Sequence, residues 1–112
     1  MRAEETVAAM LKARGWHIAF AESCTGGLAV ARLVGVAGVS DVLAESYVTY
    51  APESKVALLG VRRETIDIYG VVSEETAAEM AAGAAKRAHA EIGVGITGLA
   101  GPGGGTDALP VG

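Results

Sequence analysis

The chain has 112 residues, of which 51% are hydrophobic and 20% are charged. This balance excludes an intrinsically disordered chain, which combines low hydrophobicity with high net charge, and the length suits one domain. The formal net charge is −4 and the sequence contains no run of lysine or arginine, so we expect no nucleic-acid partner.

The cysteine content and the hydropathy pattern narrow the class of protein further. A single cysteine excludes an internal disulfide framework and a cysteine-based zinc site. The sequence shows neither a run of about 18 uncharged apolar residues nor the pattern of a signal peptide. We therefore expect a soluble, cytoplasmic domain with no membrane partner.

Two helices and two strands are predicted in the first half of the chain. Apolar residues at helical spacing predict an amphipathic helix over 3–14. Residues 16–21 (WHIAFA) have the composition of a buried strand, a turn over 22–27 follows, and 28–34 predicts a second helix. Residues 44–50 (AESYVTY) again have strand composition.

Three helices and a third strand are predicted in the second half. A proline at the first helical position opens a helix over 52–59, and a short helical piece is predicted over 63–69. Ser73 is a favourable N-cap for a long alanine-rich helix. Residues 91–97 (EIGVGIT) predict a strand, and a glycine-rich loop follows over 98–105.

Helices that alternate with short apolar strands indicate an α/β fold: a single-domain sandwich with a mostly parallel sheet flanked by helices. Parallel sheets place their sites beyond the carboxyl ends of the strands. The segments 22–27, 50–55 and 97–105 each follow a predicted strand. We therefore expect these three segments to converge on one edge of the sheet.

The turn after the first strand, ESCTGG, is the first candidate for chemistry. Ser23 in this turn would be an exposed nucleophile, with N–H groups at the start of the next helix holding an oxyanion. The alternative is that Ser23 or Thr25 simply caps that helix. Cys24 is a rival nucleophile, because thiolates at helix starts are activated. Glu22, taken alone, is interpreted as a local cap or a solvated charge.

Lys55 and Tyr50 form the second candidate group. Lys55 is predicted in the first turn of a helix, where the helix dipole disfavours a cation. If it is also desolvated, its pKa falls and it can act as a base near neutrality. The alternative is a solvated surface lysine. The phenol of Tyr50 could relay a proton or donate to an oxyanion, or it could only pack at an interface.

The glycine-rich loop and the two histidines complete the candidates. The loop 98–105 could cradle a phosphate with backbone N–H groups, or it could be a plain flexible loop. It has the pattern of neither a dinucleotide-binding nor a Walker A loop. His17 and His89 are interpreted as structural residues. With one cysteine, the two histidines form no recognisable metal set, and no cofactor is expected.

Taken together, these segments resemble the CinA C-terminal domain family, the nicotinamide mononucleotide deamidases. The matching stretches are AESCTGG at 21–27, YVTYAPESKVALLGV at 47–61, GVVSEETAAEMAAGA at 70–84 and GITGLAGPGGGTDALPVG at 95–112. The resemblance covers nearly the whole chain in the right order. AESCTGG joined to an AGPGGG loop is more specific than either motif alone.

The resemblance implies hydrolysis of the carboxamide of nicotinamide mononucleotide to nicotinate mononucleotide and ammonia, in pyridine nucleotide salvage. It implies that Ser23 is the nucleophile and that Lys55 and Tyr50 assist it, with Lys55 as the base. Substrate contacts are then expected from the two flanking loops, with the phosphate resting on the glycines of the second. The expected set is Glu22, Cys24, Thr25, Gly26, Gly27, Thr97, Gly98, Gly101, Gly103, Gly104 and Gly105.

The resemblance also bears on the extent of the domain and its partners. Members of the family usually continue beyond the P-V-G motif by about two strands and a helix, so we expect residues 1–112 to be a C-terminally truncated family domain. A sheet that lacks strands exposes an edge, which makes a homodimer plausible. The alternatives to an enzyme are a module that binds a nucleotide without turnover and an interaction module.

Overall fold

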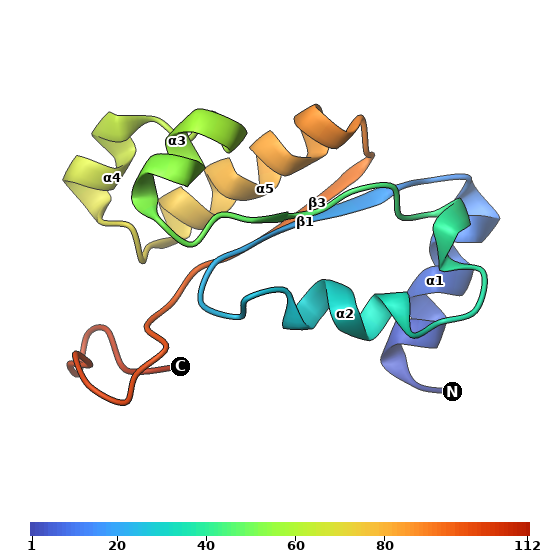
Figure 1. Ribbon diagram of the computed structural model, residues 1–112, viewed down its shortest axis with the longest axis horizontal. Coiled ribbons are helices and arrows are strands. Elements are labelled where there is room, and N and C mark those ends of the chain that lie inside the picture. The colour runs from blue at the N-terminus through green and yellow to red at the C-terminus, as the bar shows by residue number, and fades with distance from the viewer.

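Helices and strands alternate along the chain in the computed structural model, which describes residues 1–112 (Figure 1). The strands are β1 (Ile18–Glu22), β2 (Tyr47–Val48) and β3 (Ile92–Ile96). The helices are α1 (Ala3–Arg14), α2 (Leu28–Val34), the 3₁₀ turn η1 (Val39–Asp41), α3 (Pro52–Leu59), α4 (Arg63–Tyr69) and α5 (Glu74–Ala88). None of these helices has the length and hydropathy that a membrane crossing requires.

The three strands form one parallel sheet in the order β2-β1-β3, which confirms the predicted α/β class. In β1, Ala21 pairs with Tyr47 of β2, and Ile18 pairs with Ile92 of β3. Because all three strands run in the same direction, their carboxyl ends lie at the same edge of the sheet. The segments that follow the strands therefore leave the sheet on the same side.

The strands differ in extent from the sequence prediction, most of all over 44–50. Only Tyr47–Val48 is strand there. Just before its start, the Ser46 side chain accepts the Phe20 N–H at 2.9 Å, in the place of a backbone carbonyl. The strand predicted over 16–21 begins two residues later, at Ile18, and ends one residue later, at Glu22. The predicted strand 91–97 loses one residue at each end.

Helices cover both faces of the sheet, with α1 and α2 on one side and α3, α4 and α5 on the other (Figure 1). The buried strand β1 alternates between these faces. Ile18 and Phe20 belong to the core cluster that contains α1 and α2, whereas Ala19 and Ala21 belong to the cluster with α3 and α5. This alternation follows the two-residue period of a strand.

Glycines in β3 let helix α5 lie directly on the sheet. A Cβ added to Gly95 would lie 2.1 Å from the Ala77 carbonyl oxygen, and one added to Gly93 would lie 2.0 Å from the Ala81 carbonyl oxygen. Only a residue without a side chain permits such a close approach. The contact fixes the end of β3, from which the loop beginning at Thr97 extends.

Candidate active site

A cavity of about 190 Å³ lies at the edge where the strands end. Its walls come from the segments after all three strands and from the connection between α4 and α5. The lining residues are Ser23, Cys24, Tyr50, Pro52, Lys55, Val71, Val72, Thr97, Gly98, Leu99 and Ala100. The structure therefore brings together the three segments in which the sequence predicts chemistry, although only the first part of the glycine-rich loop takes part.

Lys55 is buried beside Ser23. Its side chain lies in the first half of α3, and the residue is 1% exposed. The Nζ atom lies 3.0 Å from Ser23 Oγ, 2.6 Å from the Thr49 carbonyl oxygen and 3.1 Å from the Tyr50 carbonyl oxygen. Lys55 takes part in none of the ion pairs of the chain.

The surroundings of Lys55 favour its neutral form. Burial removes water from the ammonium group and lowers the pKa of Lys55, against a smaller opposing effect of Cys24. A neutral amine has two N–H donors and one lone pair. In the structure, Nζ donates to Ser23 Oγ and to the carbonyl oxygens of Thr49 and Tyr50. When the amine is neutral, the two carbonyl oxygens can accept its two N–H groups, and its lone pair then faces Ser23 Oγ.

Tyr50 contributes to the site through its backbone. Its carbonyl oxygen accepts from Lys55 and, at 3.4 Å, from the Ser23 hydroxyl. The tyrosine side chain lines the cavity but is 65% exposed, and its phenol bonds to neither Ser23 nor Lys55 in the structure. Because Lys55 contacts Ser23 directly, no phenol is needed to relay the proton between them.

Glu22, one of the predicted substrate contacts, is bonded within the protein. It is fully buried and is absent from the cavity lining. Its carboxylate accepts the Thr25 hydroxyl at 2.5 Å, and it also accepts three backbone N–H groups, of Gly27 and Ala29 at 3.1 Å and of Val30 at 2.8 Å. Burial alone would raise the pKa of Glu22, but these hydrogen bonds outweigh burial and lower it.

The bonds to Glu22 also correct the expected position of an oxyanion. The N–H groups of Gly27, Ala29 and Val30, at the start of α2, already have an acceptor. Within the turn, the backbone N–H groups of Ser23, Cys24 and Thr25 donate to no atom of the chain. Gly26 N–H is also used, because it donates to the Ser23 carbonyl oxygen at 3.0 Å. The unpaired donors therefore lie before the helix.

Thr97, Gly98 and Cys24 form one wall of the cavity. The Thr97 hydroxyl donates to the Val71 carbonyl oxygen at 3.0 Å, so it joins the loop after β3 to the segment between α4 and α5. A Cβ added to Gly98 would lie 3.2 Å from Cys24 Sγ. Cys24 is a free, half-buried thiol that packs against this loop. Lys55 Nζ is bonded to the Ser23 hydroxyl and not to this thiol.

Two parts of the predicted substrate-contact set lie outside the cavity lining. In the first turn, Thr25 bonds to Glu22, and two glycines adopt the positive φ angles of 61° and 105° that the turn requires: Gly26 and Gly27. In the loop after β3, the exposed residues are Gly101, Gly103, Gly104 and Gly105. The nearest atoms to a Cβ added at Gly101 or Gly105 belong to the Pro110–Val111 segment.

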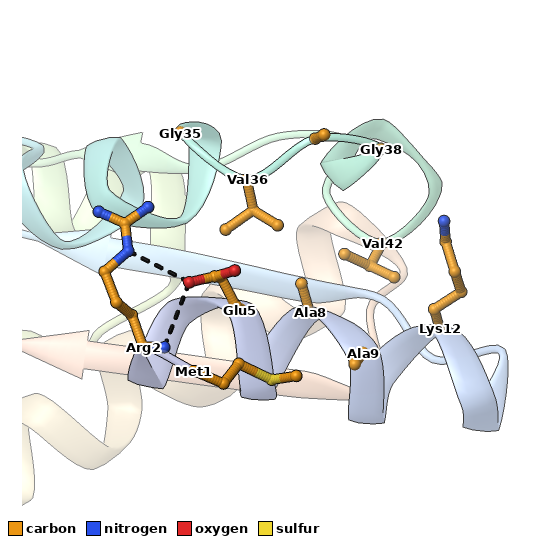
Figure 2. Close-up of a pocket in the computed structure, with 11 residues that line it drawn as sticks. Met1, Arg2, Glu5, Ala8, Ala9, Lys12, Gly35, Val36, Gly38 and Val42 are labelled. Atoms are coloured by element: carbon orange, nitrogen blue, oxygen red, sulfur yellow. Dashed lines mark hydrogen bonds and ion pairs between the residues drawn. The ribbon is translucent and has the colours of Figure 1, made fainter.

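A larger hollow of about 400 Å³ lies between α1 and the segment from Gly35 to Val42 (Figure 2). Its charged side chains pair with neighbours, Arg2 with Glu5 at 3.2 Å and Lys12 with Asp41 at 3.2 Å. It contains none of the motif residues. The smaller cavity at the strand ends therefore remains the candidate site.

Several residues of the site were not predicted from the sequence. The two acceptors of Lys55 are backbone carbonyls, which leave no side-chain signal. Val71 and Val72 enter the wall from a connection that carries no motif. His17 lies at the other end of β1, where its N–H donates to Glu91, and His89 ends α5 in a left-handed conformation.

A buried lysine bonded to a serine thus lies where the strands of a parallel α/β sheet end. The family model "CinA C-terminal domain" matches residues 1–112, and the chain belongs to this family. It is 54% identical over 109 residues to a CinA-like protein of Kosmotoga olearia, and 51% identical over 112 residues to a CinA-like protein of Chloroherpeton thalassium.

Solved structures of the family share the fold. The competence damage-inducible protein A (ComA) of Klebsiella pneumoniae superposes with a TM-score of 0.91 at 40% identity, over 97% of this chain and 68% of that chain. The competence/damage inducible protein CihA of Agrobacterium tumefaciens superposes with a TM-score of 0.89 at 40% identity. The chain spans about a quarter of the two curated relatives, 26% and 27% of their lengths.

Proposed function

We propose that this chain is an amidohydrolase domain that hydrolyses the carboxamide of nicotinamide mononucleotide to a carboxylate and ammonia. The observation that carries the proposal is the buried Lys55, which forms no ion pair and whose Nζ lies 3.0 Å from Ser23 Oγ. Such a pair activates a serine, since the hydroxyl is a weak nucleophile until a base takes its proton. The resemblance to the deamidases supports the choice of amide.

In the proposed reaction, Lys55 accepts the Ser23 proton as Oγ bonds to the amide carbon. The amide oxygen becomes an oxyanion, and the unpaired N–H groups of the turn 23–25 stabilise it. The C–N bond then breaks, and Lys55 returns the proton to the leaving nitrogen, which departs as ammonia. Water hydrolyses the acyl-serine by the same proton path and restores the Ser23 hydroxyl.

The size and lining of the cavity support a small aromatic amide as the reacting end of the substrate. Cavities that hold whole drug-sized ligands measure about 300–1,000 Å³, and this one measures about 190 Å³. Val71, Val72 and Leu99 supply apolar contact for a pyridine ring. Lys55 is the only cationic side chain in the lining, so the ribose phosphate extends beyond the cavity.

The test is ammonia release from nicotinamide mononucleotide, with Cys24→Ala as a matched control for Ser23→Ala. The two residues are neighbours in one turn, and both line the cavity. We expect Ser23→Ala to abolish release with the fold intact, and Cys24→Ala to retain most of it. Release that survives Ser23→Ala, or is lost only in Cys24→Ala, would exclude Ser23 as the nucleophile.

A protein that is folded but releases no ammonia would favour the alternative reading, a module that binds a nucleotide without turnover. Titration of the same protein with nicotinamide mononucleotide then separates the two cases. Binding without release identifies the module, whereas neither binding nor release excludes this substrate.

A further inference from the structure

Glu22 is the most completely bonded carboxylate of the chain. It is 0% exposed, and its two oxygens accept four hydrogen bonds, from Thr25, Gly27, Ala29 and Val30. No positively charged side chain takes part in these bonds. A buried carboxylate without a cation is costly unless hydrogen bonds replace its hydration, so this arrangement requires all of its donors.

Glu22 is also the last residue of β1 and the direct neighbour of Ser23. Its bonds therefore tie the end of the strand, the middle of the turn and the start of α2 into one unit. The turn between these elements has left-handed backbone at Gly26 and Gly27, which a free chain would not hold in one conformation. Ser23 is the first residue of that turn.

Resting on the proposed function, we infer that Glu22 is a positioning residue: it fixes the turn that carries Ser23 and, by occupying the α2 N–H groups, reserves those of residues 23–25 for the oxyanion. The inference rests on the four hydrogen bonds of Glu22, its complete burial and its absence from the cavity. It assigns Glu22 no contact with the substrate.

The electrostatics support this division of the N–H groups. The start of a helix carries a partial positive charge, which attracts anions. The Glu22 carboxylate neutralises that charge and saturates three of the donors. A second anion gains little at the same place. The N–H groups of Ser23, Cys24 and Thr25 keep their full capacity to donate.

The experiment compares Glu22→Gln with Glu79→Gln. Glu79 accepts backbone and hydroxyl donors away from the site, the Arg62 N–H at 2.8 Å and the Thr65 hydroxyl at 2.6 Å. Unlike Glu22, it also pairs with a guanidinium, that of Arg62 at 3.3 Å. Glutamine has nearly the shape of glutamate but offers one acceptor oxygen instead of two. In Glu22→Gln, the N–H of Val30 or the partners of the other oxygen then face an NH₂ group, and the turn shifts.

We expect Glu22→Gln to lower kcat about 10- to 100-fold, since a misplacement of about 1 Å in a catalytic group costs about 100-fold in rate. KM should stay within about twofold, because Glu22 does not line the cavity. The acid limb of the pH–rate profile should not move, because Glu22 is not among the groups that shift the pKa of Lys55. Glu79→Gln should leave all three quantities unchanged.

Two outcomes would overturn the inference. A rise in KM with unchanged kcat would make Glu22 a substrate contact. Stability lowered in both variants with kcat unchanged would make Glu22 only structural. If Glu22→Gln does not fold, Thr25→Val replaces it, because this variant removes one bond to the carboxylate and keeps the charge. It should lower kcat about 3- to 10-fold at constant KM, an effect of about 1 kcal/mol, and unchanged kcat would again overturn the inference.

Labelling of Ser23 by a fluorophosphonate separates this inference from the proposed function. The probe reacts with an activated serine and places a phosphoryl oxygen where the oxyanion would lie, so it requires no amide substrate. Labelling that slows in Glu22→Gln by the same factor as kcat supports the inference, even if nicotinamide mononucleotide is not hydrolysed. Equal labelling of wild type and Glu22→Gln overturns it, even if ammonia is released. Absence of labelling in the wild type overturns both.

Discussion

The turn 22–27 and the loop 97–105 can be compared directly, because both lie where a parallel strand ends at the same edge of the sheet and both contain several glycines. In the turn, Glu22 is buried and accepts four hydrogen bonds. In the loop, Thr97 bonds to the Val71 carbonyl oxygen and Gly112 N–H bonds to the Leu99 carbonyl oxygen. The stretch 101–105 beyond them is exposed.

The difference lies in what surrounds the glycines: a buried carboxylate bonds to the turn, and none bonds to the exposed stretch of the loop. Glycine permits unusual backbone conformations, but it also adds conformational freedom that something else must remove. In the turn, a buried carboxylate removes it, and the next residue is Ser23. In the loop, Gly101 and Gly105 lie against Val111, and no buried carboxylate bonds to the stretch 101–105. We therefore expect substitutions in the turn region to have much larger effects than substitutions in the exposed loop.

The largest expected effect is on activity, from Lys55→Met. Methionine is long and flexible enough to fill the space of the lysine stem but accepts no proton from Ser23. General base catalysis contributes about 100- to 10,000-fold to a rate, so kcat for ammonia release should fall by a factor in that range. Steady-state kinetics measures it. A variant with more than a tenth of wild-type kcat would remove Lys55 from the mechanism.

The next largest effect is on stability, from Glu22→Ala. The substitution leaves the Thr25 hydroxyl and three backbone N–H groups without their acceptor. Each buried donor left unsatisfied costs about 1–3 kcal/mol, so we expect a loss of about 3 kcal/mol or more in the free energy of unfolding, measured by urea denaturation.

Glu79→Ala is the matched control for that loss. The Glu79 side chain is 26% exposed, so water can replace the missing acceptor and the cost should be about 1 kcal/mol. Equal losses in the two variants would show that the turn is no more tightly fixed than the start of α4.

The pH dependence of stability tests the burial of Lys55. Since burial lowers the pKa of Lys55 in the folded state, the unfolded chain binds the extra proton between that pKa and 10.5. Stability therefore rises with pH across this window and is lost as the pH falls through it, with a slope of at most about 1.4 kcal/mol per pH unit. Below the folded pKa both states are protonated, and the slope vanishes.

The difference in unfolding free energy between wild type and Lys55→Met isolates this contribution from the other titrating groups. It should move in favour of the wild type as the pH rises toward 10.5, and then level off. The same pKa sets the activity, because protonated Lys55 cannot accept the Ser23 proton, so kcat/KM should fall on the acid side. A difference that is flat with pH would place Lys55 in water.

The elements of the fold were predictable where local rules dominate. Pro52 at the first turn and Gly60 in a left-handed cap bound α3 as predicted, and the Ser73 side chain caps α5 by accepting the Thr76 N–H. β2 was not predictable in extent. At its start, the Ser46 side chain bonds to the Phe20 N–H, 26 positions away in the sequence, and such a long-range bond leaves no local signal.

The site was predictable in its side chains but not in their contacts. Ser23 and Lys55 were chosen by residue type and place, yet they are 32 positions apart, and their contact depends on the pairing of β1 with β2. The acceptors of Lys55 are backbone carbonyls, which any sequence would supply. The burial of Glu22 and its bonds to α2 were not predictable, because they arise only in the folded turn.

The smallest expected effect sharpens the comparison within the loop itself. A Cβ added to Gly103 meets nothing within 4 Å and φ there is not in the left-handed region, so Gly103→Ala is free of clash and strain. Surface changes of this kind alter stability by about 0.5 kcal/mol or less. KM for nicotinamide mononucleotide should stay within twofold, because Gly103 lies outside the cavity lining.

Gly98→Ala is the matched variant, because Gly98 lines the cavity and the new Cβ would lie 3.2 Å from Cys24 Sγ. That crowding presses on the residue next to Ser23, so we expect kcat/KM to fall several-fold while Gly103→Ala remains at wild-type level. A phosphate cradle over 101–105 requires the opposite order, since a methyl group at Gly103 would then obstruct the phosphate and raise KM. The two variants measured side by side therefore decide whether the exposed glycines bind the substrate or only connect the cavity wall to residues 106–112.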